Sequence, residues 1–284
     1  MKLSGKTLIV TGSGTGIGKA IAKLCVKEGA QVVINDKNAA LANLTVEELG
    51  SGNAVPHVRD LTEDGCPEEL VALAKERFGK LDGLVNNAAF VTWSNLDSTN
   101  RDYFRKVLEV NTIAPLALIQ AALPDLKKNG GNVVNIGSVN AHCGEPTLLA
   151  YSASKGALTT LTRNLGDTLM QEHGVRVNQV NPGWVLTENE AARKREHGLK
   201  EDWYRDIPKK FAPSGRIFHP EEIASTVVHL LNSDCGPVSG QVIDLEQYPM
   251  IGRKFEGFQF LFGSENGIGI YFLFSMAGRL FCGF

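Results

Sequence analysis

Seven short apolar runs alternate with segments of helical periodicity, and this alternation limits the fold more than any other feature. The runs lie at 6–12, 31–36, 53–60, 81–89, 131–138, 174–183 and 240–246. The helical segments lie between them, at 18–30, 39–49, 66–79, 102–128, 151–167 and 220–233. Strands that are apolar throughout and alternate with helices are typical of a parallel sheet covered on both faces. We therefore predict a single-domain, doubly wound α/β fold with a seven-stranded parallel sheet, whose ligands bind beyond the carboxyl ends of the strands.

Length and charge limit the number of domains and the kinds of partner. At 284 residues with 43% apolar content, the chain can hold one large α/β domain, and no internal boundary is visible before about residue 253. A formal net charge of -2 gives no reason to expect binding to nucleic acid or to an anionic membrane surface.

The cysteines and the N-terminus indicate a cytoplasmic protein. The first apolar run is too short for a signal peptide, and no cleavage site follows it. No two cysteines form a Cys-x-x-Cys pair, and none has histidines at zinc-ligand spacing. We therefore expect reduced thiols and no metal site. The cysteines are Cys25, Cys66, Cys143, Cys235 and Cys282.

Residues 254–284 differ from the rest of the chain, being dense in Phe and Gly without a helical or strand period. Their apolar part, 267–278, is shorter than the ~20 residues that a membrane-spanning helix needs. A subunit-contact segment, a membrane anchor and a poorly ordered or non-native extension all stay open as interpretations. We divide the chain into a catalytic domain, 1–253, and this atypical C-terminal extension.

A glycine-rich turn, TGSGTGIG at 11–18, joins the first apolar run to the first helical segment. Its glycines permit a tight turn and close backbone approach, and the positive end of the helix can hold a pyrophosphate, as in a Rossmann fold. The turn is not a strict G-x-G-x-x-G, so a plain glycine-rich turn is the alternative. Asp36 ends the second run about 20 residues later, where a carboxylate would bind an adenosine ribose and repel a 2′-phosphate. This pattern favours NAD over NADP, although Asp36 could instead cap the next helix.

A tyrosine and a lysine four residues apart, Tyr151 and Lys155, begin the helical segment after the fifth run. This spacing puts them on one helix face, and Ser138 ends the fifth run, so all three lie at the carboxyl edge of the sheet. A free tyrosine, with a pKa of ~10, is a poor base at neutral pH, whereas a shielded ammonium nearby lowers that pKa. Tyr151 could then take a proton from a substrate hydroxyl while hydride leaves the same carbon, and Ser138 would hold the substrate oxygen.

Six motifs in order resemble those of the short-chain dehydrogenase/reductase family, over residues 6 to about 245. They are TGSGTGIG, NNAA at 86–89, VNT around Asn111, GSV at 137–139, YSASK at 151–155 and NPGWVLT at 181–187. The resemblance implies an NAD(P)-dependent oxidoreductase with a catalytic tetrad of Asn111, Ser138, Tyr151 and Lys155. It further implies that Asn111 holds a water linking Lys155 to bulk solvent, and that Lys155 bonds the nicotinamide ribose.

The resemblance also implies which residues contact the cofactor. They are Gly12, Ser13, Gly16, Ile17, Gly18, Asp36, Asp60, Leu61, Asn87, Ala88, Tyr151, Lys155, Val185 and Thr187. Family members that use NADP usually carry a basic residue before the second motif glycine or after the second strand. Thr15 fills the first of these places and Asp36 precedes the second, which again favours NAD.

Two departures from the family pattern are visible. Ala89 replaces a common glycine, and DLEQYPMIGRKF at 244–255 replaces the usual Asp-Gly-Gly turn. Family members are commonly tetramers, so the resemblance implies a homo-oligomer, either a tetramer or a dimer. Gln247 and Tyr248 could then complete a neighbouring subunit's pocket.

The substrate should lie over the nicotinamide, among the loops after the fourth, fifth and sixth runs. Polar groups among aromatic faces there favour a sugar or polyol over a lipid. The substrate candidates are Ser138, Asn140, His142, Glu145 and Trp184, with Trp93 and Glu188 nearby and Trp203 and Tyr204 in a lid at about 187–214. Two alternatives stay open: a 3-oxoacyl or small-ketone reductase with the same tetrad, and a non-catalytic dinucleotide-binding sensor.

Overall fold

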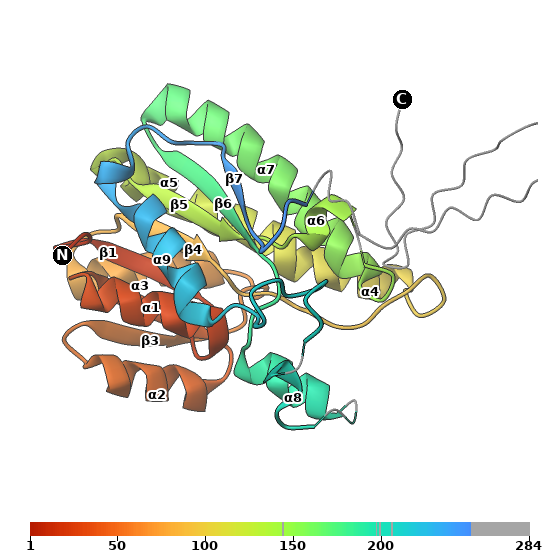
Figure 1. Cartoon of the computed structure of the whole chain (residues 1–284). Helices are drawn as coiled ribbons and strands as arrows, with labels where there is room; N and C mark the ends of the chain where they lie inside the picture. Colours follow the sequence, from red (N-terminus) through yellow and green to blue (C-terminus); the bar gives the residue numbers. More distant parts are fainter. Residues whose placement is uncertain (144, 197, 199, 206, 251–284) are drawn as a thin grey trace, which may run out of the picture.

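One parallel sheet runs through the middle of the molecule (Figure 1). The structure is a computed structural model and describes residues 1–250 apart from 144, 197, 199 and 206. Its seven strands lie in the order β3-β2-β1-β4-β5-β6-β7, with every neighbouring pair parallel. Their bounds are β1 Thr7–Thr11, β2 Gln31–Asp36, β3 Ala54–Val58, β4 Gly83–Asn86, β5 Asn132–Ile136, β6 Arg176–Pro182 and β7 Val242–Leu245. The predicted doubly wound, seven-stranded parallel sheet is confirmed.

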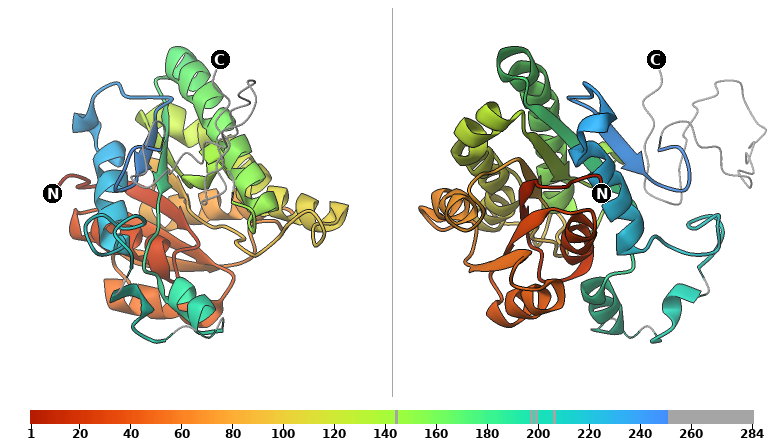
Figure 2. Two further views of the ribbon diagram at one scale, coloured as in Figure 1. Left: turned by 45° about the vertical axis from the view of Figure 1, so that its right-hand side comes forward. Right: turned by 90° about the vertical axis from the view of Figure 1, so that its left-hand side faces the viewer.

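Helices cover both faces of the sheet (Figures 1 and 2). Helices α1, α2 and α9 pack on one face with Leu8 and Val10, and α3, α5 and α7 pack on the other with Ile9. Successive side chains of a strand point to opposite faces, so both must be apolar when both faces are covered. The bounds are α1 Gly16–Lys27, α2 Ala39–Leu49, α3 Cys66–Phe78, α4 Arg101–Leu108, α5 Ala114–Asn129, α6 Asn140–Cys143, α7 Leu149–His173, α8 Glu188–Glu196 and α9 Pro220–Leu231.

The strand order reverses at β1, which pairs with β2 on one side and with β4 on the other. In doubly wound sheets, ligands bind at this reversal, beyond the carboxyl ends of the strands. The loops that follow β1, β2, β4, β5 and β6 all leave from this edge, because the strands are parallel. They carry most of the predicted site residues, so the topology gathers segments that are far apart in the sequence.

The helical segment predicted at 102–128 is interrupted by a π-helical turn, Glu109–Ile113, between α4 and α5. Such turns are rare and often occur at functional sites, and this one contains Asn111. Within the described part of the chain, Arg101–Asn129 is also long and apolar enough to cross a membrane, judged by length and composition alone. Its Leu118 and Leu126 are fully buried against the sheet, and core helices of globular proteins pass the same test.

Two helices lie outside the predicted segments, α6 and α8. Helix α6 is a short turn directly after β5 that packs against α7. Helix α8 stands apart from the helix layers that cover the sheet (Figures 1 and 2), within the predicted lid. Its residues are mostly polar and none is buried, so it lacks the apolar stripe by which the other helices are recognised.

The run predicted as a strand at 81–89 ends in the structure at Asn86. The backbone N–H groups of Asn87 and Ala88 both donate to Thr11 Oγ1 at 3.0 Å instead of continuing the ladder. The chain is thereby drawn across the end of β1 toward the glycine loop.

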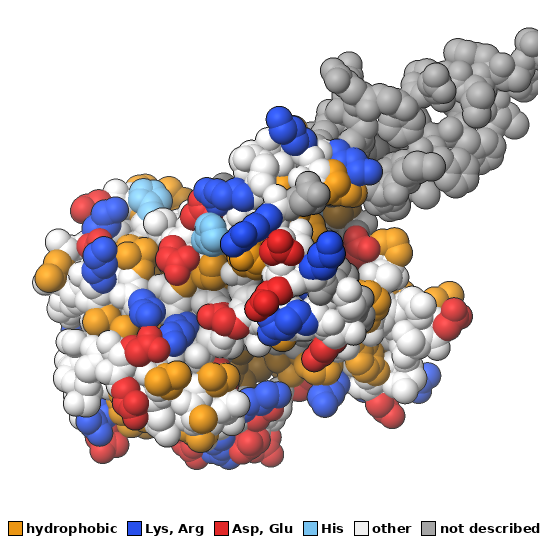
Figure 3. Space-filling model, turned by 60° about the horizontal axis from the view of Figure 1, so that its bottom comes forward, with side chains coloured by type: hydrophobic (Ala, Val, Ile, Leu, Met, Phe, Trp, Pro, Cys, Tyr) orange, Lys and Arg blue, Asp and Glu red, His pale blue; other side chains and the backbone are white. Residues whose placement is uncertain are grey.

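Acidic and basic side chains are interspersed over the face shown in Figure 3, without a large area of one sign. The predicted boundary at 253/254 and all interpretations of 254–284 lie outside the described residues.

Candidate active site

The glycine loop between β1 and α1 is packed too closely for side chains. A Cβ on Gly12 would lie 2.8 Å from Ala88 Cα, and one on Gly18 would overlap the carbonyl oxygen of Gly12. Gly12 and Gly16 also have positive φ angles of 59° and 55°, which glycine adopts without strain. The loop therefore presents bare backbone at the N-terminus of α1, where N–H groups and the helix dipole favour an anion. This cradle fits the diphosphate of a dinucleotide.

Asp36 lies beside this loop at the end of β2. Its carboxylate accepts hydrogen bonds from the N–H groups of Gly14, at 3.1 Å, and Asn38, at 2.9 Å. The N-cap of α2 is Asn38, whose side chain accepts from the N–H of Leu41 at 3.2 Å. Helix capping is thus carried out by Asn38, and the carboxylate of Asp36 faces the loop.

Other predicted cofactor residues hold the loop in shape. The Ser13 hydroxyl donates to Val10 O at 2.7 Å, and its N–H donates to Asn35 O at 3.0 Å, so both donors are used inside the turn. Asn87 Nδ2 donates to the carbonyl oxygens of Thr11 and Gly12, each at 2.9 Å. Ile17 packs partly buried against the core layer beneath α1.

The predicted adenine contacts, Asp60 and Leu61, follow β3. Asp60 accepts from the Thr62 N–H at 3.0 Å and from its hydroxyl at 2.9 Å. Burial raises the pKa of Asp60, but the hydrogen bonds from Thr62 and the charge of Lys37 outweigh it and leave the pKa lowered. Leu61 packs partly buried against the core layer that contains α3.

Ser138 is fixed at the end of β5 by a residue of the neighbouring strand. Asn181 Oδ1, at the end of β6, accepts from the Ser138 N–H at 3.0 Å and from Gln179 Nε2 at 2.7 Å. Ser138 Oγ accepts from the Asn140 N–H at 3.2 Å. The hydroxyl is therefore held where Tyr151 can reach it.

Tyr151 projects from the first turn of α7, and its side chain lies close enough to Ser138 for that residue to affect the pKa of the phenol. Burial raises the pKa of Tyr151, outweighing the hydrogen bond from Ser138 and the positive charge of Arg193, which lower it. The sequence predicts a lowered pKa, because it places an ammonium beside the phenol. In the structure the opposite holds, since the phenol is shielded from water and desolvation is the larger effect.

Lys155 lies one helical turn further along α7, only 2% exposed. Its Nζ donates to Ile136 O at 2.7 Å and lies 5.7 Å from the centre of the Tyr151 ring. Burial lowers the pKa of Lys155 to about 8. The predicted pairing on one helix face is thus present, but the ammonium bonds to the end of β5.

Asn111 joins three segments around the π-helical turn. Its Oδ1 accepts from the Phe90 N–H at 2.7 Å, and its Nδ2 donates to Phe90 O at 3.1 Å and to Ser154 Oγ at 2.9 Å. Ser154 in turn donates to Tyr151 O at 2.7 Å. Both Nδ2 donors of Asn111 are therefore used in tying the loop after β4 to α7.

The structure distributes the predicted substrate residues over four places. Asn140 and Ser138 lie together at the tetrad. His142 instead turns toward β7, where its Nε2 lies 2.8 Å from Asp244 Oδ1. Asn140 and Glu145 also line a surface cavity of about 520 Å³ beside α7. Trp184 lies just before the lid, and its Nε1 donates to Glu190 Oε1 within the lid at 2.9 Å.

The lid is organised around a stack of two tryptophans. The rings of Trp184 and Trp203 lie 5.2 Å apart at 25°, and Tyr204 meets Trp203 edge-on. Glu190 is paired with Arg193 in addition to Trp184. Near the base of this lid, Val185 is buried and Thr187 Oγ1 accepts from the Glu190 N–H at 3.1 Å.

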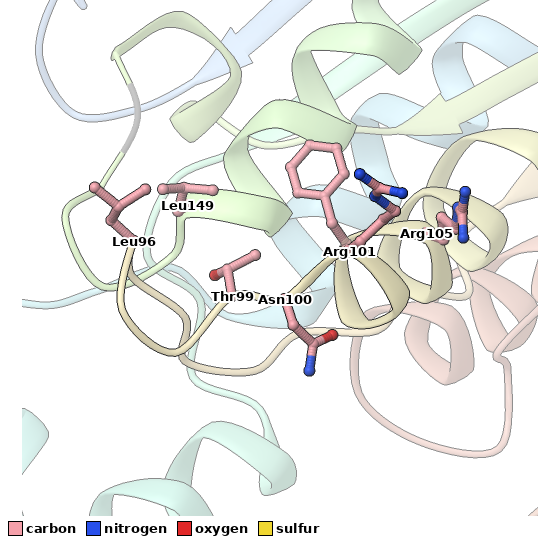
Figure 4. Close-up of a pocket in the computed structure, with 7 residues that line it drawn as sticks. Leu96, Thr99, Asn100, Arg101, Arg105 and Leu149 are labelled. Atoms are coloured by element: carbon pink, nitrogen blue, oxygen red, sulfur yellow. The ribbon is translucent and has the colours of Figure 1, made fainter.

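A further cavity of about 470 Å³ lies between α4, the loop before it and the start of α7 (Figure 4). Leu96, Thr99, Asn100, Arg101 and Arg105 come from the loop before α4 and from α4 itself, and Leu149 begins α7. None of the predicted site residues lines it.

Comparison with known proteins decides the family. A family model described as enoyl-(acyl carrier protein) reductase matches residues 12–246. The chain belongs to the short-chain dehydrogenase/reductase family. It is therefore an oxidoreductase, and members of the family use nicotinamide cofactors.

Named relatives of this short-chain dehydrogenase/reductase differ in substrate. It is 37% identical to an L-fucose dehydrogenase from Mus musculus over 81% of this chain and 83% of that protein. It is 33% identical to a glucose 1-dehydrogenase from Bacillus subtilis, over 85% of this chain and 93% of that protein. It is 30% identical to a D-beta-hydroxybutyrate dehydrogenase from Rhizobium meliloti, over 85% of this chain and 97% of that protein.

Several residues around the site of this short-chain dehydrogenase/reductase escaped the sequence analysis. Asn181 and Asp244 position Ser138 and His142, but a polar residue at the end of a strand has no signal of its own. The pairing of Glu190 with Arg193 does have a sequence signal, since oppositely charged residues three positions apart face each other on a helix.

Proposed function

We propose that this protein is an NAD-dependent dehydrogenase that oxidises a secondary alcohol of a sugar or polyol, with Tyr151 as general acid/base. The observation that carries the proposal is the grouping of three side chains: Ser138 lies close enough to Tyr151 to lower its pKa, and the buried Lys155 Nζ lies 5.7 Å from the centre of the Tyr151 ring. These groups lie at the carboxyl edge of the sheet, where the cradle of the glycine loop also opens.

Each residue has a separate task in this proposal. When bound, the nicotinamide supplies the hydride acceptor or donor. Tyr151 takes the proton of the substrate hydroxyl in oxidation and returns it to a carbonyl oxygen in reduction. Ser138 donates a hydrogen bond to the same oxygen and stabilises charge that develops there. Lys155 favours the phenolate by its charge, and Asn111 keeps α7 in register with the loop after β4.

The preference for a neutral substrate rests on how the nearby cations are paired. Arg193 acts on the pKa of Tyr151 and so lies close to the site, but Glu190 pairs with it. Lys194 lies 3.8 Å from Glu190 Oε1 and over the rings of Trp184 and Trp203. A carboxylate substrate would need a cation that is not already neutralised. Aromatic faces with hydrogen-bonding groups suit a polyhydroxylated ligand better, and the names of two relatives agree with a sugar.

A reductase of 3-oxoacyl compounds or small ketones is the second candidate. Its support is the description of the matching family model, which names an acyl carrier protein substrate. The tetrad would be the same, with Tyr151 donating its proton. A non-catalytic sensor is disfavoured, because Asn111, Ser138, Tyr151 and Lys155 are all present, and Ser154 links Asn111 to the backbone of Tyr151.

A substrate panel tests the proposal. Purified protein would be assayed for NADH or NADPH formation with L-fucose, D-glucose, other aldoses, polyols, 3-hydroxybutyrate and simple secondary alcohols. Reduction of acetoacetyl thioesters and small ketones would be followed alongside. We expect turnover of at least one sugar or polyol with NAD. Turnover confined to thioesters or ketones would select the second candidate, and binding of NAD without any turnover would select the sensor.

Asp36→Asn should change cofactor preference. We expect kcat/KM with NAD to fall by about tenfold and the ratio of NAD to NADP activity to fall further, because the variant loses both a charged ribose acceptor and the repulsion of a 2′-phosphate. Glu47→Gln on α2 is the control, as an exposed carboxylate with no contact to the glycine loop among the described residues. If Asp36→Asn kept the same preference for NAD over NADP, Asp36 would not be the residue that binds the adenosine ribose.

We also propose that the protein is a cytoplasmic homo-oligomer, a tetramer or a dimer. Gln247, expected to complete a neighbour's pocket, accepts within its own chain from the Ser214 N–H at 3.0 Å and from its hydroxyl at 2.7 Å. These bonds hold the base of the lid, and the role of Gln247 in a neighbour's pocket stays a prediction. Mass measurement of the native protein in solution tests the assembly, and a monomer would refute it.

A further inference from the structure

The carboxylate of Glu188 lies on the N-terminus of α1. Glu188 Oε2 accepts hydrogen bonds from the Gly16 N–H and from Thr15 Oγ1, each at 3.1 Å. Glu188 is the first residue of α8, whereas Thr15 and Gly16 belong to the glycine loop and the start of α1. The contact therefore joins the lid to the cofactor cradle across 172 positions of sequence.

This carboxylate uses the donors that a dinucleotide requires. The first N–H groups of a helix have no partner within the helix and attract anions. In a glycine-rich βα turn, these groups bind the cofactor's diphosphate. A Glu188 oxygen bonded to the Gly16 N–H takes one of them, and its negative charge would lie against the diphosphate.

The contact between Glu188 and the glycine loop can also be broken without leaving buried groups unpaired. Glu188 is exposed, so water can replace its hydrogen bonds when it leaves. Thr187 caps the first turn of α8 through the Glu190 N–H at 3.1 Å, so movement of Glu188 passes to the helix. The methyl group of Thr187 lies only 3.3 Å from the Cβ position of Gly16, so the same turn covers the loop.

We propose that Glu188 is a residue that sets cofactor affinity, because it occupies the diphosphate position at α1 and must leave when a dinucleotide binds. Its departure frees the first turn of α8, which couples cofactor binding to the position of the lid. This inference rests on the dinucleotide site proposed above. It differs from the family's general cofactor contacts, because it assigns a residue that opposes binding.

Glu188→Gln tests the proposal against a matched variant of the same helix. Glutamine keeps the size of the side chain and removes its charge. We expect the dissociation constant for NADH, measured by fluorescence titration, to fall about three- to tenfold. Glu196→Gln makes the same change of charge at the exposed far end of α8, and should alter the constant by less than about twofold. An unchanged constant in Glu188→Gln, or an equal fall in both variants, would overturn the proposal.

Hydrogen exchange of α8 provides a second readout without turnover. In the absence of dinucleotide, Glu188→Gln should exchange the amides of α8 faster than the wild type and Glu196→Gln do. Inorganic pyrophosphate should have the same effect on the wild type by displacing Glu188. If the wild type binds neither NADH nor NADPH, the proposed function fails, and these exchange rates still decide whether Glu188 holds the lid. Equal exchange in all samples would refute the contact.

Discussion

Replacing Tyr151 by phenylalanine should lower kcat by about 10³-fold or more and leave NAD affinity within about twofold. The substitution removes only the phenol hydroxyl, whose pKa Ser138 affects. The ring remains to pack at the start of α7, so the glycine loop and Asp36 keep their geometry. Steady-state kinetics on the best substrate of the panel, together with NADH titration, separate loss of chemistry from loss of binding.

Tyr103→Phe is the control for removing a phenol hydroxyl. The Tyr103 hydroxyl makes a long hydrogen bond of 3.5 Å to Thr92 O near α4, away from Ser138. This variant should keep most of the activity. If Tyr151→Phe also kept most of its activity, another group would have to transfer the proton.

The raised pKa of Tyr151 sets the direction of the pH dependence in the wild type. The phenol keeps its proton at neutral pH, which suits donation to a carbonyl oxygen. Oxidation of an alcohol needs the phenolate, so we expect its rate to rise with pH above neutrality while reduction does not. A rate of oxidation that is flat from pH 7 to 10 would contradict Tyr151 as the base.

The fold could be predicted from the sequence because its signals are repeated. Each strand is apolar on both faces, and each helix that covers the sheet shows its own periodicity, so one ambiguous segment could not change the result. The bounds of β2 and α2, for example, agree with the predicted runs. The interruption of the helix at Glu109–Ile113 could not be predicted, because it is a response to the Phe90 backbone, which approaches only in the folded chain.

Part of the candidate site could also be predicted from the sequence, and part could not. Tyr151 and Lys155 are linked by helical spacing, and Ser138 is placed by the end of a strand, so local rules locate them. The pKa of Tyr151 depends on whether burial or the ammonium has the larger effect. That depends on how tightly α7 packs, which cannot be predicted from the sequence. His142 shows the same limit, since its partner Asp244 lies on a strand 102 positions later.

Lid residues were the hardest to place. Trp184 and Trp203 were expected to face a ligand, and the structure stacks them on each other instead. An aromatic residue in a polar loop indicates that its ring packs against another group, but it does not indicate which group. The sequence places Glu188 only near the substrate candidates, and its contact with Gly16 depends on a tertiary approach.

Lys155→Met should be more stable than the wild type at pH 7. It should also lack most of the rise in stability that the wild type shows at alkaline pH. Burial lowers the pKa of Lys155 from 10.5 to about 8, so the unfolded chain binds this proton more tightly than the folded one. The folded state is therefore disfavoured by about 3 kcal/mol at low pH. This penalty is relieved as pH rises from about 8 toward 10.5, because the folded chain then gives up the buried proton while the unfolded chain still holds it. Above pH 10 the raised pKa of Tyr151 acts in the opposite direction and lowers stability.

The comparison is best made at pH 7 and pH 9.5, by urea unfolding of both proteins. Methionine has no charge to bury, but it leaves Ile136 O without its hydrogen bond, a cost of about 1–2 kcal/mol. We therefore expect Lys155→Met to be about 1–2 kcal/mol more stable than the wild type at pH 7, with that advantage lost or reversed at pH 9.5. Lys128→Met, at an exposed position near the end of α5, should show no such dependence. Turnover should fall at least 100-fold in Lys155→Met alone, because the phenolate loses its stabilising charge. A wild type that gains no stability over Lys155→Met between the two pH values would mean that the ammonium of Lys155 is not buried as the structure has it.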